Sequence, residues 1–200
     1  MRKKIAVLIS DIGTGTNLQA VIDGIGYKKI NAKIVSVISD TEKSLGLNRA
    51  KKHNLPTEIS PKKEDLLNLL KKHNPDLICL AGWKQIITKD VIDAYENRIL
   101  NLHPGLIPDK MNSHVKNPNN TIGLWNKGKM TNKAMQEFLN RHSTYAGSSI
   151  HFLTHEFDYG PVLERCFEKI REDDTIDTLY SRLKKKENKI YVVALSKLCI

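Results

Sequence analysis

Three apolar runs, each followed by a more polar stretch, restrict the fold of this chain more than any other feature. The runs are KIAVLIS at 4–10, KIVSVIS at 33–39 and DLICLAG at 76–82. Strands that are apolar throughout are typical of parallel sheets covered on both faces, and helical segments alternate with them here. The pattern predicts one α/β domain over residues 1–200, Rossmann-like, with a mostly parallel central sheet of about seven strands and helices on both faces.

The segments between these runs carry helix and turn signals. A helix is predicted from about Asn17, a second over 45–52, and a brief edge strand over 56–59. Ser60 and Pro61 are typical of an N-cap and a first helical residue, which predicts a third helix from there to about His73. In such a fold, ligands gather beyond the carboxyl ends of the strands, where residues 13–17, 83–87 and 101–103 all fall.

The composition is that of a water-soluble globular protein, with 40% hydrophobic and 27% charged residues. No apolar run approaches the ~20 residues that span a bilayer, and the start, MRKKIAVLIS, is typical of a first strand rather than a signal peptide. Cys79, Cys166 and Cys199 lack metal-binding spacing and favour reduced thiols. We therefore expect a cytoplasmic protein without membrane contact.

The formal net charge of +10 indicates either an acidic partner or a solvated basic surface. The sequence lacks basic segments interleaved with aromatic residues, so we do not expect nucleic acid as a partner. A basic field would instead steer small phosphorylated or polycarboxylate substrates towards the protein. The expected partners are small molecules, and the expected assembly is a monomer or a homodimer.

The stretch NLHPGLIP at 101–108 is the strongest candidate for a catalytic centre. Asn101 and His103 are two residues apart, so on a strand both side chains project from one face. An amide donor beside an imidazole suits a carbonyl that becomes an oxyanion, because the amide can donate a hydrogen bond and the imidazole can donate another or move a proton. The alternative is a strand end with a turn and a structural histidine.

A glycine-rich turn at 11–16 stands between the first strand and the first helix. Gly15, Thr16 and Asn17 open that helix, where backbone N–H groups and the helix dipole favour an anion. The dinucleotide fingerprint fails because its third small residue is Leu18, and no Walker lysine follows. A monophosphate cradle and a plain tight turn both remain open.

Residues 109–144 form a long segment rich in Asn and Lys, with one or two helical turns predicted over 133–141. Strands are predicted over 148–154 and 162–170, with a turn at 156–160. His151 and His155 lack a third ligand, which disfavours a metal site. The last helix, from about Thr175, should expose Lys184, Lys185 and Lys186 and bury Leu179, Leu183, Ile190, Val193 and either Val192 or Leu195.

Five stretches together resemble the phosphoribosylglycinamide formyltransferases, the folate-dependent transformylases of purine biosynthesis. They are VLIS…GTGTNLQAVID, SDTEKSLGLNRA, LAGW, NLHPGLIP and GSSIHFLTHEFDYGPVL. The likeness covers nearly the whole chain. It implies transfer of a formyl group from 10-formyltetrahydrofolate to the amine of glycinamide ribonucleotide, with no metal. It also implies a phosphate-binding half over 1–100 and a catalytic and folate-binding half over 101–200, with an insertion at about 109–144.

The resemblance also implies roles for single residues. The catalytic set would be Asn101, His103 and Asp158, although Asp158 taken by itself is typical of a turn. The acceptor would be held at its phosphate by Gly15, Thr16, Asn17 and Lys63, and at its ribose by Glu187. The folate would be bound by Trp83, Lys84, Gln85, Ile86, Ile87, Asn101, His155, Glu156 and Asp158.

Three departures from the family pattern indicate a divergent member. The family has Phe-Met-Arg-Ile-Leu where this chain has residues 83–87, and it has SLLP where this chain has Gly105, Leu106, Ile107 and Pro108. The segment between His103 and Asp158 is also longer than usual. Alternative functions are therefore a sugar-nucleotide amine formyltransferase, a formyltetrahydrofolate hydrolase, or a non-catalytic nucleotide-binding protein on the same fold.

Overall fold

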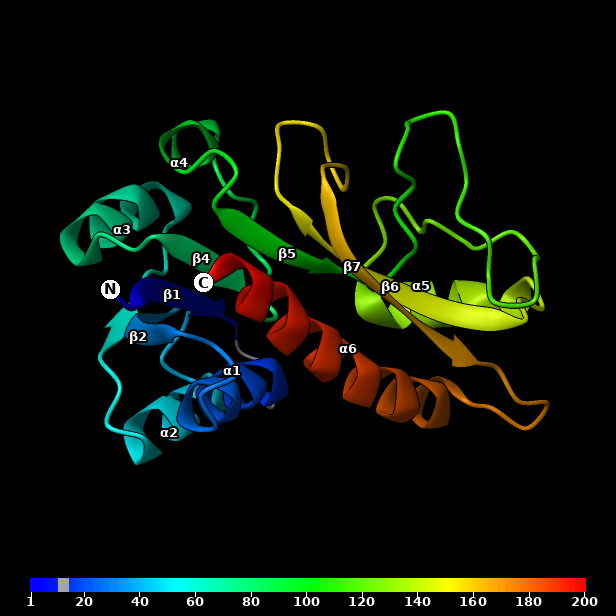
Figure 1. Cartoon of the computed structure of the whole chain (residues 1–200), viewed down its shortest axis with the longest axis horizontal. Coiled ribbons are helices and arrows are strands. Elements are labelled where there is room, and N and C mark those ends of the chain that lie inside the picture. Colours follow the sequence, from blue (N-terminus) through cyan, green and yellow to red (C-terminus); the bar gives the residue numbers. More distant parts are fainter. Residues whose placement is uncertain (11–14) are drawn as a thin grey trace. The chain divides into compact units, whose positions relative to one another are not determined.

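The computed structural model describes residues 1–10 and 15–200, so the predicted turn residues 11–14, Gly13 among them, lie outside the described residues. Within these residues, seven strands form one sheet in the order β3-β2-β1-β4-β5-β6-β7 (Figure 1). The strands are β1 (Lys3–Ile9), β2 (Ala32–Ser39), β3 (Thr57–Ile59), β4 (Leu77–Leu80), β5 (Ile99–His103), β6 (Tyr145–Phe152) and β7 (Val162–Lys169). The helices are α1 (Thr16–Gly26), α2 (Leu45–Lys52), α3 (Leu66–His73), α4 (Lys89–Ala94), α5 (Thr131–Asn140) and α6 (Ile176–Leu198), and η1 (Lys63–Asp65) is a short 3-10 helix.

The chain divides into two compact units. The first contains Met1–Asn101 together with Leu195–Ile200, and the second contains Leu102–Ala194. The division falls close to the expected boundary between the two functional halves at residue 100. The organisation as one domain stays a prediction.

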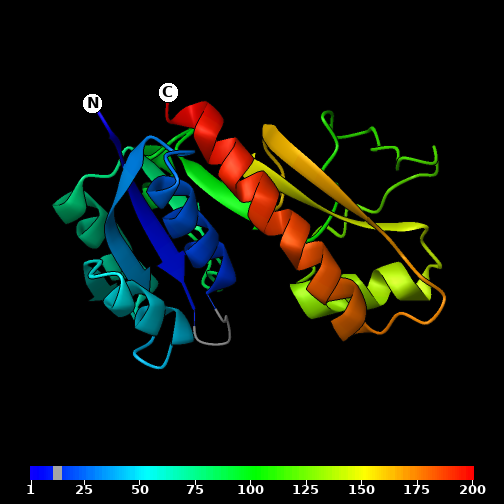
Figure 2. The same cartoon turned by 60° about the horizontal axis from the view of Figure 1, so that its bottom comes forward.

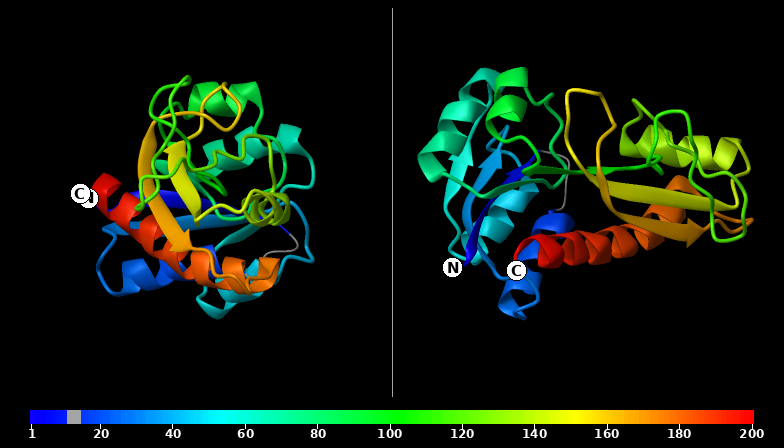
Figure 3. Two further views of the ribbon diagram at one scale, coloured as in Figure 1. Left: turned by 90° about the vertical axis from the view of Figure 1, so that its right-hand side faces the viewer. Right: turned by 45° about the horizontal axis from the view of Figure 1, so that its top comes forward.

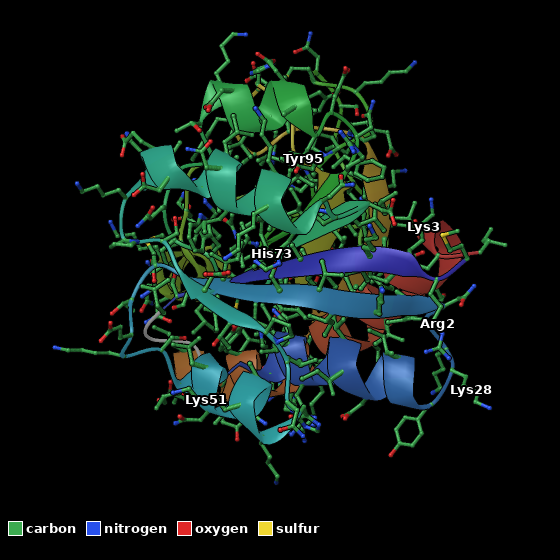
Figure 4. All side chains as sticks on the ribbon, turned by 90° about the vertical axis from the view of Figure 1, so that its left-hand side faces the viewer. Arg2, Lys3, Lys28, Lys51, His73 and Tyr95 are labelled. Carbon is green, nitrogen blue, oxygen red and sulfur yellow. The ribbon has the colours of Figure 1, made fainter. Side chains whose placement is uncertain are left out.

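The first unit is built on parallel strands. β1 pairs in parallel with β2 and with β4, and β4 pairs in parallel with β5. The three apolar runs were predicted to be neighbouring parallel strands, and this is confirmed. Helices α1 and α2 lie on one side of these strands, and α3 and α4 on the other (Figure 4). Both faces of the sheet are therefore covered, which explains why Ile5, Val7 and Leu8 of β1 are fully buried.

One helix prediction in this unit is wrong, and one helix was not predicted. Ser60 is not an N-cap, because its hydroxyl donates to the carbonyl of Lys62 at 3.2 Å, and the 3-10 turn η1 precedes α3. The third helix therefore begins at Leu66 rather than at Pro61. The helix α4 was not predicted at all, since six residues are too few to establish a helical period.

The second unit is an antiparallel hairpin with two helices. β6 and β7 pair in antiparallel register from Tyr145↔Lys169 to His151↔Val162. Helices α5 and α6 belong to the same unit (Figure 2), and their side chains pack with those of the hairpin around one apolar cluster. The buried members of the cluster are Ala134, Met135, Phe138, Ala146, Cys166, Leu179 and Leu183. The predicted helix within the long insertion is α5, and it contributes three of these residues.

The prediction for the last helix is partly wrong. Leu179, Leu183 and Leu195 are fully buried as expected, but Val193 is 41% exposed. Lys184 is also not on a wholly solvated face, because its side chain is only 23% exposed and lies 3.3 Å from Oε2 of Glu187. None of the helices in the described ranges is both long enough and apolar enough to span a membrane.

Candidate active site

His103 ends strand β5 and is only 2% exposed. Its Nε2 lies 2.6 Å from the carbonyl oxygen of Trp125, and its Nδ1 lies 3.5 Å from Oδ1 of Asp158. A carbonyl oxygen can only accept a hydrogen bond, so Nε2 carries the proton in this contact. The other ring nitrogen, Nδ1, faces Asp158. Asn101, two residues earlier on β5, is half-buried and paired in register with Leu80.

Asp158 lies in the loop of residues 153–161 that joins β6 to β7 (Figure 3). Its backbone is left-handed, with φ of 49°. Oδ2 accepts a hydrogen bond from the N–H of Gly128 at 2.7 Å. Burial by itself would raise the pKa of the Asp158 carboxyl, but the hydrogen bond and charge of His103, together with the Gly128 N–H, lower the pKa below its ordinary value. The structure thus brings His103 and an ionised Asp158 together.

His151 on β6 is a third titratable group beside this pair, although its spacing from His155 pointed only to a disfavoured metal site. It is fully buried, and its Nδ1 lies 3.0 Å from the carbonyl of Phe152. Burial and the charge of His103 lower the pKa of His151 to about 4, against the opposing effects of Phe152 and Asp158. His151 is therefore neutral near pH 7. No set of three potential metal ligands occurs in the part of the chain that the structure describes.

Gly15, Thr16 and Asn17 open α1 in the first unit. Gly15 is the residue before the helix and has φ of 70°, which glycine adopts without strain. Thr16 Oγ1 and Asn17 Oδ1 are buried and find no hydrogen-bond partner among the described residues. A Cβ on Gly15 would lie 3.1 Å from Cδ of Arg49, which places beside this helix end a cation that was not predicted from the sequence. The arrangement suits an anion at the start of α1.

The stretch 83–87 follows strand β4 in the same unit. The Lys84 N–H donates to Ser10 Oγ at 2.9 Å, so the stretch is fixed to the carboxyl end of β1. Trp83 Nε1 and Gln85 Oε1 are buried and have no hydrogen-bond partner among the described residues, whereas Ile86 is 71% exposed. Lys63 lies in the exposed helix η1 after the edge strand β3, and β2 separates that strand from β1 in the sheet.

The remaining predicted residues belong to the second unit. Glu187 on α6 is 2% exposed, its Oε1 accepts from Ser148 Oγ at 2.7 Å, and its Oε2 faces Lys184. His155 and Glu156 are exposed in the 153–161 loop, and Glu156 pairs with Lys127 at 2.7 Å. Trp125 and Gly128, which contact His103 and Asp158, were not predicted. The available signal was a lone aromatic residue in an otherwise polar segment.

Comparison with known proteins identifies the family. A model of the formyl transferase family matches residues 3–195. The chain belongs to the formyl transferase family. The predicted resemblance and the predicted α/β fold are both confirmed at this level.

Individual relatives carry more specific names. A phosphoribosylglycinamide formyltransferase of Haemophilus influenzae is 32% identical over 96% of this chain and 85% of its own length. The chloroplastic phosphoribosylglycinamide formyltransferase of Arabidopsis thaliana is 27% identical, and the chain spans 66% of it. The human trifunctional purine biosynthetic protein adenosine-3 is 29% identical, and the chain spans only 18% of it.

Solved structures agree on the fold. Glycinamide ribonucleotide transformylase 1 of Symbiobacterium toebii is 30% identical, with a TM-score of 0.83 over 98% of this chain and 86% of that one. A phosphoribosylglycinamide formyltransferase of Coxiella burnetii is 32% identical, with a TM-score of 0.79 over 100% of this chain and 88% of that one. A formyltetrahydrofolate deformylase of Pseudomonas syringae has a TM-score of 0.79 at 18% identity, which shows a shared fold alone.

Proposed function

We propose that this protein transfers a formyl group from 10-formyltetrahydrofolate to the amine of glycinamide ribonucleotide, in de novo purine biosynthesis. The observation that carries the proposal is the pair of buried His103 and half-buried Asp158, with Nδ1 and Oδ1 3.5 Å apart. Relatives of similar length with phosphoribosylglycinamide formyltransferase names, such as that of Haemophilus influenzae, support this acceptor over the alternatives.

The folate supplies the formyl group, and the residues of β5 and the 153–161 loop supply the proton chemistry. The amide of Asn101 donates a hydrogen bond to the formyl oxygen as negative charge develops on it. Loss of one such donor typically costs about 10²–10³ in rate. Asp158 and His103 move the proton that the amine loses to the folate nitrogen that departs. These steps need no metal and no covalent nucleophile.

Two of the residues proposed for the folate, Trp83 and Gln85, have unused hydrogen-bonding capacity. Trp83 Nε1 is a buried donor and Gln85 Oε1 a buried acceptor, both without a partner among the described residues. A buried polar atom without a partner is costly, and a polar heterocycle could satisfy both. His155 and Glu156 are exposed and accessible to the rest of the folate.

The acceptor is proposed to bind through its phosphate at Gly15, Thr16 and Asn17, where the start of α1 favours an anion. Lys63 is the proposed additional cation. Glu187 is proposed for the ribose, and its two carboxylate oxygens have different contacts. Oε1 is held by Ser148, and Oε2 has no hydrogen bond within the described residues and could accept one from a ribose hydroxyl.

We further propose that the protein is cytoplasmic and acts on small molecules as a monomer or a homodimer. Cys79, Cys166 and Cys199 are buried thiols outside any disulfide, which fits a reducing compartment. Burial raises the pKa of Cys166 to about 12, so this thiol stays protonated and unreactive.

A panel of amine acceptors tests the proposal. Purified protein is incubated with 10-formyltetrahydrofolate and either glycinamide ribonucleotide, a sugar-nucleotide amine, or no acceptor, and tetrahydrofolate and the formylated product are measured. We expect product only with glycinamide ribonucleotide. Release of formate at an equal rate without acceptor would identify a hydrolase instead. Product with the sugar-nucleotide amine alone would assign the acceptor to that class.

A further inference from the structure

The loop of residues 125–128 contacts both members of the His103–Asp158 pair. The Trp125 carbonyl binds Nε2 of His103 at 2.6 Å, and the Trp125 indole N–H donates to the Asp158 carbonyl at 2.9 Å. The Gly128 N–H donates to Oδ2 of Asp158 at 2.7 Å. Three hydrogen bonds from four consecutive residues thus hold the imidazole, the carboxylate and the backbone that carries the carboxylate.

The 125–128 loop is itself firmly anchored in the second unit. Asn126 has a left-handed backbone, with φ of 56°, and its Nδ2 donates to the carbonyls of Pro104 and Ala134. Lys127 pairs with Glu156 at 2.7 Å and lies over the Trp125 ring. The ring of Tyr159 packs against Trp125 with centroids 5.7 Å apart. These contacts hold the 125–128 loop in place, so that the loop can in turn hold His103 and Asp158.

Gly105 allows the Trp125 carbonyl to reach the histidine. A Cβ at this position would overlap the Trp125 carbonyl oxygen and would lie 2.8 Å from Nε2 of His103. Any side chain on residue 105 would therefore push the backbone of the 125–128 loop away from the imidazole. The contact between His103 and Trp125 requires both the loop and a glycine after the His-Pro pair.

We infer that the 125–128 loop, with Trp125 at its centre, is the positioning element of the catalytic pair, and that it reserves Nδ1 of His103 for proton transfer. Trp125 is a positioning residue, because it acts through His103 and Asp158. The consequence for turnover rests on the proposed function, whereas the tautomer of His103 does not depend on any substrate.

The reserved nitrogen fixes the route of the proton. Formyl transfer forms a bond between the amine nitrogen and the formyl carbon and breaks the bond from that carbon to the folate nitrogen. The amine nitrogen loses one proton, and the folate nitrogen accepts one. With Nε2–H bound to the Trp125 carbonyl, His103 exchanges this proton through Nδ1, on the side that Asp158 faces.

Two variants test the role of the loop. Trp125→Phe keeps an aromatic ring and removes the indole N–H, and Gly105→Ala displaces the Trp125 carbonyl. We expect kcat to fall about 10-fold in Trp125→Phe and about 10²-fold in Gly105→Ala, with the acceptor KM changed less than about twofold, since misplacement of a catalytic group affects the chemical step. Tyr27→Phe and Gly26→Ala are the matched controls, because Tyr27 is 76% exposed and Gly26 has open space at its Cβ.

Nitrogen-15 NMR of the imidazole supplies a readout that needs no substrate. The signals of His103, assigned with a His103→Gln variant, should show Nε2 protonated in the wild type and altered in Gly105→Ala. Wild-type signals and wild-type kcat in both variants would overturn the inference, as would an unprotonated Nε2 in the wild type. If the NMR result is as expected and no formyl transfer occurs with any acceptor, the inference about positioning stands and the proposed function fails. Trp125→Phe keeps the test decisive should Gly105→Ala not fold.

Discussion

At the scale of single residues, Asp158 is the side chain whose surroundings most restrict its chemistry. Asparagine tolerates the left-handed backbone found at this position, so Asp158→Asn should keep the loop and remove only the proton acceptor. We expect turnover to fall by about 10²-fold or more, with substrate dissociation constants little changed. Single-turnover kinetics and equilibrium binding of both substrates separate the two effects.

His103→Ala is the companion variant and should be at least as damaging, because it removes both the imidazole and the partner of the carboxylate. Wild-type turnover of Asp158→Asn at saturating substrate would exclude Asp158 from proton transfer. Weak substrate binding in that variant, with an unchanged chemical step, would assign Asp158 to binding instead.

His151 gives a prediction about stability and pH. Its pKa is about 4 in the folded protein and about 6.5 when unfolded, so the unfolded state binds more protons between these values. The contribution of neutral His151 to the free energy of unfolding is therefore fully present above about pH 6.5. It is lost as the pH falls towards 4, by about 3 kcal/mol in total. Urea unfolding of the wild type and of His151→Gln from pH 7 to 4 checks this. The variant should lose less stability over that range, and parallel curves would contradict the expectation.

At the scale of elements, the start of α1 makes a prediction about the acceptor. Thr16→Asp places a negative charge where the helix dipole and N–H groups are proposed to hold a phosphate. We expect a higher KM for the phosphorylated acceptor with an unchanged KM for folate. Thr16→Asn, similar in size and uncharged, is the control. Unchanged acceptor affinity in Thr16→Asp would count against a phosphate at this helix end.

The start of α6 is fixed to β7 by Arg182. Its guanidinium pairs with both oxygens of Asp174, at 2.6 and 2.7 Å, and its Nε donates to Glu168 at 2.9 Å. Hydrogen bonds from Arg182 lower the pKa of the Asp174 carboxyl far below its usual range. Arg182→Met leaves the buried Asp174 carboxylate without its ionic partner, whereas Glu168 keeps its pair with Lys186, and we expect the variant to be destabilised by about 2–4 kcal/mol in chemical denaturation. Exposed Lys185→Met should have little effect.

Helices and strands were predictable where many residues carry the same signal. They were not predictable where a single contact decides the local conformation. The strand β1 was predicted within one residue at each end, because a run of apolar residues fills the middle of the sheet. Ser60 failed as a helix signal, since a single hydrogen bond to Lys62 satisfies its hydroxyl in another way. Trp125 could not be placed, because its contacts with His103 and Asp158 arise from residues far apart in the sequence.

At the scale of the whole molecule, the apolar runs predicted the sheet and the order of the motifs predicted the family. The geometry of the candidate active site depends in addition on the insertion at 109–144. His103 was named from its own motif and Asp158 from the resemblance, and their direct proximity is a product of the folded second unit. Because residues 109–144 leave directly from the catalytic strand, we also predict that they cover or border the acceptor site. The contacts of Trp125 and Gly128 tie this insertion to the catalytic pair.

The net charge of +10 is a property of the whole chain and leads to a prediction about salt. A basic field accelerates the encounter with a phosphorylated acceptor, and at physiological ionic strength it is screened beyond a Debye length of about 8 Å. We expect kcat/KM for glycinamide ribonucleotide to fall several-fold, by up to about 10, as the ionic strength rises from low to high, while kcat changes little. The dephosphorylated riboside is the control and should respond weakly. An equal response of both acceptors would show that salt acts on the protein and that its field does not steer the phosphate.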